Sequence, residues 1–164
     1  MSRVIAFVFC LLVPFTAAAQ SGDPTVDFAG DPAMSSAMND AVRTLPLFLE
    51  NAVDAEGFSV PSALVKVSFE VSGGTEVIWI GPFAVYGDGT MAGLLANRPN
   101  HMPGLNAGDP VSFSRDMIRD WAITMPDGLL WGHYTTRTIV ATLPPAQAAP
   151  IAESLSKTPI PLGW

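Results

Sequence analysis

The spacing of apolar residues changes once along this chain, and that change limits its fold more than any other feature. From Asp31 to Leu45, apolar side chains recur at steps of three and four residues, which predicts an amphipathic helix. After Gly57 they alternate with polar side chains, first over residues 63–71, which predicts a half-buried strand. A helix followed by short strands and tight turns indicates an α+β fold and argues against βαβ units with a parallel sheet.

The predicted helix has a clear beginning and an expected end. Asp31 is suited to the N-cap, and Pro32 to the first helical position. We expect helix 32–44 to pack on one face of the sheet through Met34, Met38, Ala41 and Leu45. Pro46 should end or kink the helix, because proline lacks the amide hydrogen. A second short helix should then run from Leu47 toward Gly57.

The strand pattern predicts a mostly antiparallel sheet of about five strands, either open or barrel-like. The expected strands are residues 63–71, 75–81, 90–96, 110–113 and 129–142. Gly73-Gly74 should form the first hairpin turn. Ser114 should cap a short helix from Arg115 to Trp121. The tail, residues 144–164, should hold a short helix with an irregular end.

The N-terminal residues have the pattern of a secretory signal. Arg3 precedes an apolar run from Val4 to Phe15, and small residues stand at Ala17 and Ala19. This pattern predicts a signal peptide over residues 1–19 and a flexible leader over residues 20–30. The apolar run is shorter than the roughly 20 residues that cross a bilayer, so we expect no stable membrane anchor after cleavage. The predicted location is the periplasm or the extracellular space.

Cleavage would remove Cys10, the single cysteine of the chain. The mature chain would then have no disulfide and no thiol nucleophile, and its core alone would hold it together as one domain. Fifteen acidic residues against eight basic ones give a net charge of −7. Since no Lys or Arg cluster occurs, we exclude nucleic acid as a partner.

Most familiar catalytic patterns are absent from the sequence. Beyond the signal there are two histidines, His101 and His133, and no thiolate, so we expect no metal and no cofactor. Ser154 and Lys157 match S-x-x-K, but the partner motifs of that chemistry are missing. Asp116, Asp120 and Asp127 are close enough in sequence to suggest a carboxylate pair of the kind that cleaves glycosides.

One short segment, GHYTTR at residues 132–137, gathers most of the candidate polar chemistry. As a strand it would place His133, Thr135 and Arg137 on one face and Tyr134 and Thr136 on the other. In a structural interpretation, Tyr134 packs in the core and Arg137 pairs with Asp120 beside Trp121. In a functional interpretation, the face of His133 binds an anion. The structural interpretation is favoured, because networks that fix a fold outnumber sites.

Several short motifs in order resemble the YegJ-like family of bacterial proteins, number 2314 in the series of domains of unknown function. The resemblance covers residues 31–143 and leaves out the tail. A departure occurs at Ala122-Ile123, where a Met-Tyr-like pair is expected. The resemblance implies an α+β fold and no particular reaction. Its motifs are Thr44-Leu45 with Phe48, Glu76 with Trp79, Gly93 with Asn97 and Pro99, Gly108-Asp109-x-Val111-x-Phe113, Ile118-x-Asp120-Trp121 and Gly132-x-Tyr134-Thr135-Thr136-Arg137.

Two functions remain open from the sequence. The favoured one is a secreted, non-enzymatic binding or interaction module for an unknown protein or small-molecule ligand. The alternative is a small hydrolase or sugar-acting enzyme that uses His133 with Asp116 or Asp120. An enzyme should bring His133 and an aspartate together in one cleft with perturbed ionisation. A module should instead show an exposed apolar or aromatic patch.

Overall fold

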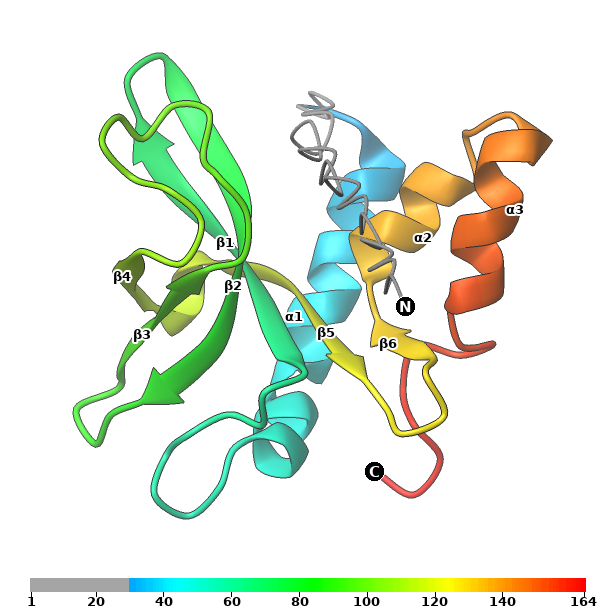
Figure 1. Ribbon diagram of the computed structural model, residues 1–164. Coiled ribbons are helices and arrows are strands. Elements are labelled where there is room, and N and C mark those ends of the chain that lie inside the picture. The colour runs from blue at the N-terminus through cyan, green and yellow to red at the C-terminus, as the bar shows by residue number, and fades with distance from the viewer. Residues whose placement is uncertain (1–29) are drawn as a thin grey trace, which may run out of the picture.

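A computed structural model describes residues 30–164 of the protein, so the expected signal peptide and nearly all of the expected leader lie outside the described residues. The fold is α+β, as predicted, with an N-terminal helix and a six-stranded antiparallel sheet of order β4-β3-β2-β1-β5-β6 (Figure 1). The sheet is curved but is not closed into a barrel. The elements in chain order are α1 (Pro32–Ala52), β1 (Ala63–Val71), β2 (Gly74–Val85), β3 (Thr90–Leu95), β4 (Pro110–Ser114), the 3-10 turn η1 (Arg115–Met117), β5 (Ile118–Thr124), β6 (Leu130–Gly132), α2 (Tyr134–Val140) and α3 (Pro145–Ser154).

The core lies between α1 and the sheet. The predicted contact residues Met34, Ala41 and Leu45 are buried, whereas Met38 is half-buried. Phe48 adds the largest contact, because its ring stacks on Trp121 of β5 with 4.8 Å between the ring centroids. Each large side chain buried in this way stabilises the fold by roughly 1.5–3 kcal/mol. The spacing of apolar residues therefore identified the buried face of α1.

The prediction that Pro46 ends or kinks the helix is wrong, because α1 continues through Pro46 to Ala52 and takes in the expected second helix. Proline leaves the carbonyl four residues earlier, that of Val42, without its helical donor. Val42 is 46% exposed and Pro46 is exposed as well. Water can bond the freed carbonyl on this outer face, while Leu45 and Phe48 hold the inner face against the sheet.

The expected strands at residues 63–71, 75–81, 90–96 and 110–113 are all present. The short helix predicted for Arg115 to Trp121 is wrong: η1 stops at Met117, and β5 begins at Ile118. The register places Trp121 opposite Val65 and Asp120 opposite Lys66. Because β5 is buried over most of its length, it lacks the alternation that marks a strand with one exposed face.

The strand predicted for residues 129–142 is also wrong beyond Gly132. β6 holds only Leu130–Gly132, and α2 follows directly. Gly132 has φ of 75°, and a Cβ at this position would lie 2.3 Å from the carbonyl oxygen of Trp121. Only glycine allows the chain to turn so close to β5. The segment GHYTTR is therefore a tight turn and the start of a helix.

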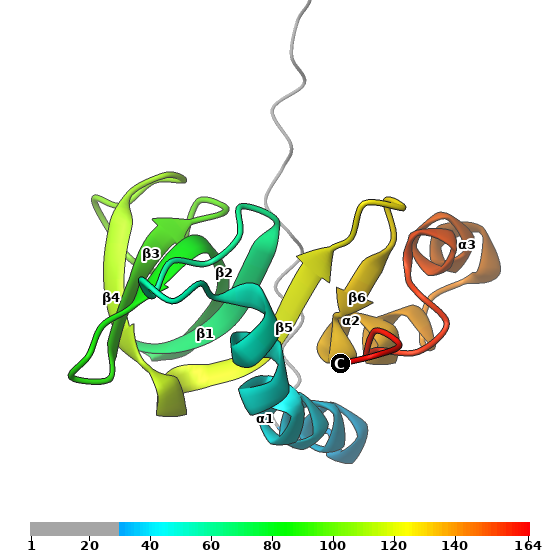
Figure 2. The same ribbon diagram turned by 90° about the horizontal axis from the view of Figure 1, so that it is seen from below.

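The C-terminal residues complete the far edge of the sheet. The tail contains the expected short helix, α3, and its continuation runs beside β6 (Figure 2). Ser156 N donates to Leu130 O (3.0 Å), and Gly132 N donates to Pro159 O (2.7 Å). Trp164 then stacks on Trp121, with 5.9 Å between centroids. Within residues 30–164, the helices are too short or too polar to cross a membrane.

Candidate functional site

The predicted site residues other than Asp116 meet where β5, β6 and α2 join, next to the outer face of β1 and β2. The register places Lys66 opposite both Trp79 and Asp120. The Lys66 ammonium lies 5.2 Å from the centre of the Trp79 ring and 3.4 Å from the Thr135 hydroxyl. We call Lys66, Trp79, Asp120, His133 and Thr135 the polar junction.

Asp120 is the fully buried centre of the polar junction. Its carboxylate accepts hydrogen bonds from Trp121 N (2.8 Å), Tyr134 N (3.1 Å), Thr135 N (2.8 Å) and the Thr135 hydroxyl (2.7 Å). Burial raises the pKa of Asp120, although these bonds and the Lys66 charge favour the ionised form. The carboxylate satisfies amide groups at the start of α2, which its own sequence leaves without a local cap. Asp120 therefore acts as a structural cap.

His133 links the turn after β6 to the neighbouring strands. Its backbone has φ of 53°, and its amide donates to Trp121 O at 2.9 Å. Nδ1 lies 3.2 Å from the Thr136 hydroxyl, and the ring centre lies 5.2 Å from that of Trp79. Burial, together with the charges of Lys66 and Arg137, lowers the pKa of His133 from 6.5 to about 4. The imidazole is thus neutral at neutral pH.

Arg137 does not pair with Asp120, so that prediction is wrong. Its guanidinium donates to Gly132 O (2.8 Å), Ser156 O (2.7 Å) and the Ser156 hydroxyl (2.8 Å). The prediction failed because this segment is a helix and not a strand. The helical backbone places Asp120 at the start of α2 and turns the Arg137 side chain toward the tail. Burial lowers the pKa of Arg137. The residue ties the tail to the turn that precedes α2.

Trp121 and Tyr134 pack in the core, as predicted, and they share a polar partner that the sequence analysis did not identify. Trp121 Nε1 donates to the Thr44 hydroxyl at 2.9 Å, and that hydroxyl lies 3.0 Å from the Tyr134 hydroxyl. The two rings meet edge to face at 5.8 Å. Burial raises the pKa of Tyr134. Thr44 thereby joins α1, β5 and α2, and its place just before the buried Leu45 was the signal available in the sequence.

The structure does not bring Asp116 into the polar junction. Asp116 is exposed in η1, before β5 begins, and accepts a hydrogen bond from the Ser114 hydroxyl, which lowers its pKa. His133 bonds to the middle of β5 instead, at Trp121. Of the two candidate carboxylates, only Asp120 lies beside His133.

A second buried carboxylate, that of Glu76, also has a structural role. It accepts hydrogen bonds from Asn100 N (2.6 Å) and His101 N (2.8 Å), and so it anchors the long loop between β3 and β4. His101 is exposed on that loop, away from the candidate residues. Across residues 30–164, the structure shows no cluster of three or more His, Cys, Asp or Glu side chains suited to a metal.

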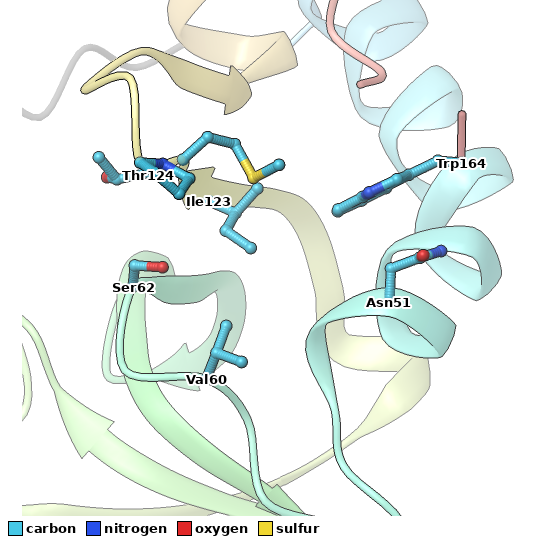
Figure 3. A pocket seen from close by; sticks show the side chains of 8 residues that line it. Asn51, Val60, Ser62, Ile123, Thr124 and Trp164 are labelled. Atoms are coloured by element: carbon cyan, nitrogen blue, oxygen red, sulfur yellow. The ribbon is translucent and has the colours of Figure 1, made fainter. Parts of the chain in front are cut away.

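Two shallow grooves lie on either side of the turn between β5 and β6. The first, of about 430 Å³, separates the end of α1 from this turn and is closed on one side by Trp164 (Figure 3). The second, of about 390 Å³, is lined by Trp131 and Leu162 among others. Both share Met125 and Pro126, and we call them the twin grooves. Their lining residues come from distant segments, so the sequence did not reveal them. No polar-junction residue lines either groove.

Together these features define an α+β protein whose polar cluster holds the fold and whose grooves are mainly apolar. The chain belongs to the family described as "Uncharacterized protein conserved in bacteria (DUF2314)", whose model matches residues 31–153. The match extends past residue 143 and includes all of α3 except its last residue. The chain is also 28% identical over 118 residues to "Uncharacterized protein YegJ" of Escherichia coli (strain K12), covering 71% of this chain and 72% of that relative. No solved structure matches significantly.

Proposed function

We propose that the protein is an exported, non-enzymatic binding module, and that the twin grooves receive an uncharged, extended segment of a partner protein. The observation that carries this proposal is the indole of Trp131. Trp131 lines the second groove, and its Nε1 is buried without an acceptor among residues 30–164. A buried donor without a partner costs about 1–3 kcal/mol, so it calls for an explanation. A backbone carbonyl of a bound segment would satisfy it once the indole turns its Nε1 toward the second groove, which Trp131 lines.

The chemistry of the twin grooves supports an uncharged, mainly apolar occupant. Their walls include Val60, Ile123, Met125, Pro126 and Trp164, and the one ionisable side chain among them is Asp127. Leu162, on the rim of the second groove, is 95% exposed. Exposed apolar side chains that gather around a groove are typical of interaction sites. The methionine adds adaptability, because its side chain can repack around different partners.

Export is the other half of the proposal and depends on the N-terminal sequence pattern. The basic residue, the apolar run and the small residues before Gln20 fit a cleaved signal. Mass spectrometry of the protein from periplasmic or medium fractions should give a chain that begins at Gln20. A chain that retains Arg3 and Cys10 in those fractions would contradict the proposed signal cleavage.

Binding can be tested with a photo-crosslinking amino acid at position 162, on the exposed rim. A crosslinked partner should be lost or reduced in Trp131→Phe, which removes the indole donor but keeps an aromatic ring. Met125→Asp should reduce it further by placing a charge in both grooves. Asp116→Asn is the matched control and should leave the crosslink unchanged. Crosslinking that is indifferent to Trp131 and Met125 would refute the proposed surface.

The alternative, a small hydrolase or sugar-acting enzyme, has one observation in its favour. His133 and Asp120 are neighbours, and burial shifts the pKa of both. Against it, the Asp120 oxygens already accept four hydrogen bonds, Asp116 lies elsewhere, and neither His133 nor Asp120 lines a groove. Turnover of chromogenic esters or glycosides that is lost in His133→Asn would favour the enzyme instead.

A further inference from the structure

The two edges of the sheet are finished in different ways. At one edge, the segment that follows α3 covers β6 through backbone hydrogen bonds. At the other edge, β4 is the outermost strand of the sheet (Figure 2). β4 has the sequence PVSFS, without a charged residue that would discourage pairing with another strand. An open and uncharged edge of this kind is a template for strand addition.

The hydrogen bonds of β3 and β4 show which backbone groups of β4 face outward. Leu95 N donates to Asp109 O, so Asp109, Val111 and Phe113 direct their backbone groups toward β3. Alternation then turns the carbonyl of Pro110 and the amide and carbonyl of Ser112 away from the sheet. Pro110 has no amide hydrogen, and Ser114 N has the Met117 sulfur at 3.4 Å as a weak acceptor. The centre of the free edge is therefore Ser112.

The sheet face beside this edge is also uncharged. On β2, β3 and β4, the side chains opposite the core alternate with buried ones such as Phe83, Met91 and Phe113. Phe58 joins the same face through its bridge to Ala84. Three of its apolar side chains are well exposed: Phe58 (60%), Tyr86 (52%) and Leu94 (39%). The face, which we call the uncharged face, consists of Phe58, Pro82, Ala84, Tyr86, Thr90, Ala92, Leu94, Pro110, Ser112 and Ser114.

We propose that β4 pairs with β4 of a second copy of this chain, in a two-fold antiparallel arrangement centred on Ser112. In this register Ser112 exchanges both backbone hydrogen bonds with its symmetry mate, and Ser114 N turns from its weak sulfur acceptor to the carbonyl of Pro110 in the other copy. Pro110 has no amide to donate in return, so the carbonyl of Ser114 in the other copy stays bonded to water at the end of the paired strands. The uncharged faces of the two copies then form one continuous surface.

The charges at the ends of β4 fit this arrangement. Asp109 precedes β4 and Arg115 follows it at the start of η1, so this register brings Asp109 of each copy to the end of the paired strands where Arg115 of the other lies. The chain is acidic, with a net charge of −7, so two copies repel over most of their surfaces. Around β4 they meet through uncharged residues and two cross-copy Asp–Arg pairs. This self-complementarity is what a two-fold interface requires, and it selects a second copy over an unrelated strand. The inference goes beyond the proposed binding function and does not involve the twin grooves.

Crosslinking tests the predicted register directly. The full chain would carry Cys10→Ser, so that no native thiol interferes, together with Ser112→Cys. A short bismaleimide should join two copies through position 112, because paired strands bring these residues to about 5.5 Å. Ser36→Cys, exposed on α1, is the matched control and should stay uncrosslinked. Equal crosslinking at both positions, or none at position 112, would overturn the proposal.

Sedimentation of the full chain over a range of concentrations tests the interface as a whole. A dimer is expected, and Arg115→Glu should raise its dissociation constant by about tenfold, because each Asp109 then faces a like charge. Asp109→Lys combined with Arg115→Glu should restore dimerisation, which separates pairing from misfolding. Arg98→Glu, on the exposed loop, controls for the change in net charge. A monomer at all concentrations, or a dimer indifferent to Arg115, would refute the β4 interface.

Discussion

The two ends of the sheet use their polar groups in opposite ways. At the β6 end, Asp120, Arg137 and Ser156 bond to the chain itself, and the tail covers the strand edge. At the β4 end, the outer face has no charged side chain among residues 30–164, and β4 is the outermost strand of the described sheet. The first end therefore determines how the chain folds, whereas the second has surface left for another molecule.

This difference cautions against equating polar residues with a site. The polar segment GHYTTR supplies the bonds that hold α2 and the tail in place. The surfaces proposed here for binding consist mainly of apolar, aromatic and hydroxyl side chains. A carboxylate that already accepts four hydrogen bonds has little capacity left for a ligand. Mutations at the two ends should therefore change different properties of the protein.

The largest expected effect is the loss of stability in Asp120→Ala. The change leaves the amides of Tyr134 and Thr135 buried without their acceptor, and we expect it to lower the free energy of unfolding by about 3–5 kcal/mol. Urea denaturation would measure the change. Asp116→Ala, which removes an exposed carboxylate, should leave the urea midpoint almost unchanged. Equal effects of the two substitutions would contradict the capping role of Asp120.

Acid should destabilise the β6 end through His133. The pKa of His133 is about 4 in the folded protein and 6.5 in the unfolded chain. Between pH 4 and pH 6.5, the unfolded chain therefore binds more protons than the folded protein. Stability should fall as the pH drops from 6.5 to 4, by at most about 3 kcal/mol. The raised pKa of Asp120 acts oppositely, because its protonation favours the folded state as the pH falls. Comparing the parent with His133→Asn, whose side chain tolerates the left-handed backbone, isolates the histidine. Identical pH profiles would show that His133 is exposed.

Arg137→Ala should have a smaller and more local effect. It removes three hydrogen bonds to Gly132 and Ser156 and should cost about 1.5–3 kcal/mol. Hydrogen exchange should accelerate at the amides of Ser156 and Gly132, which hold the tail on β6. Arg137→Lys should recover only part of the loss, since an ammonium cannot copy the guanidinium geometry. Unchanged exchange at both amides would mean that the tail is held by other contacts.

The sequence allowed a correct prediction of the elements that have one buried face. The apolar spacing of α1 and the alternation of β1 both follow from a single surface that packs on the core. It failed for β5, because that strand is buried on both faces and its sequence, IRDWAIT, does not alternate apolar and polar residues. The prediction also failed at Pro46, because the contacts of α1 with the sheet outweigh the local preference of proline to end a helix.

The candidate site was predicted only in part: Asp116 lies apart from it, and Lys66 and Trp79 were not among the predicted site residues. Asp120, Trp121, His133, Tyr134, Thr135 and Arg137 do lie close together, yet the partner of Arg137 proved to be the tail. The error follows from α2, whose threonines favour a strand by local propensity. The helix depends on Asp120, which is 14 residues before Tyr134 in the sequence. No local pattern could reveal a cap supplied from another strand.

The smallest expected change in stability is that of a substitution on the uncharged face, and it tests the difference between the two ends of the sheet. Leu94→Ser should change the stability of the monomer by less than about 0.5 kcal/mol, because this side chain is already 39% exposed. If the copies pair through β4, dimerisation adds stability that grows with protein concentration. The difference in melting temperature between the parent and Leu94→Ser should then widen from micromolar to higher concentrations. Leu162→Ser, 95% exposed at the other end of the molecule, should show no such dependence. A gap that stays constant with concentration for Leu94→Ser would place this face outside any interface between copies.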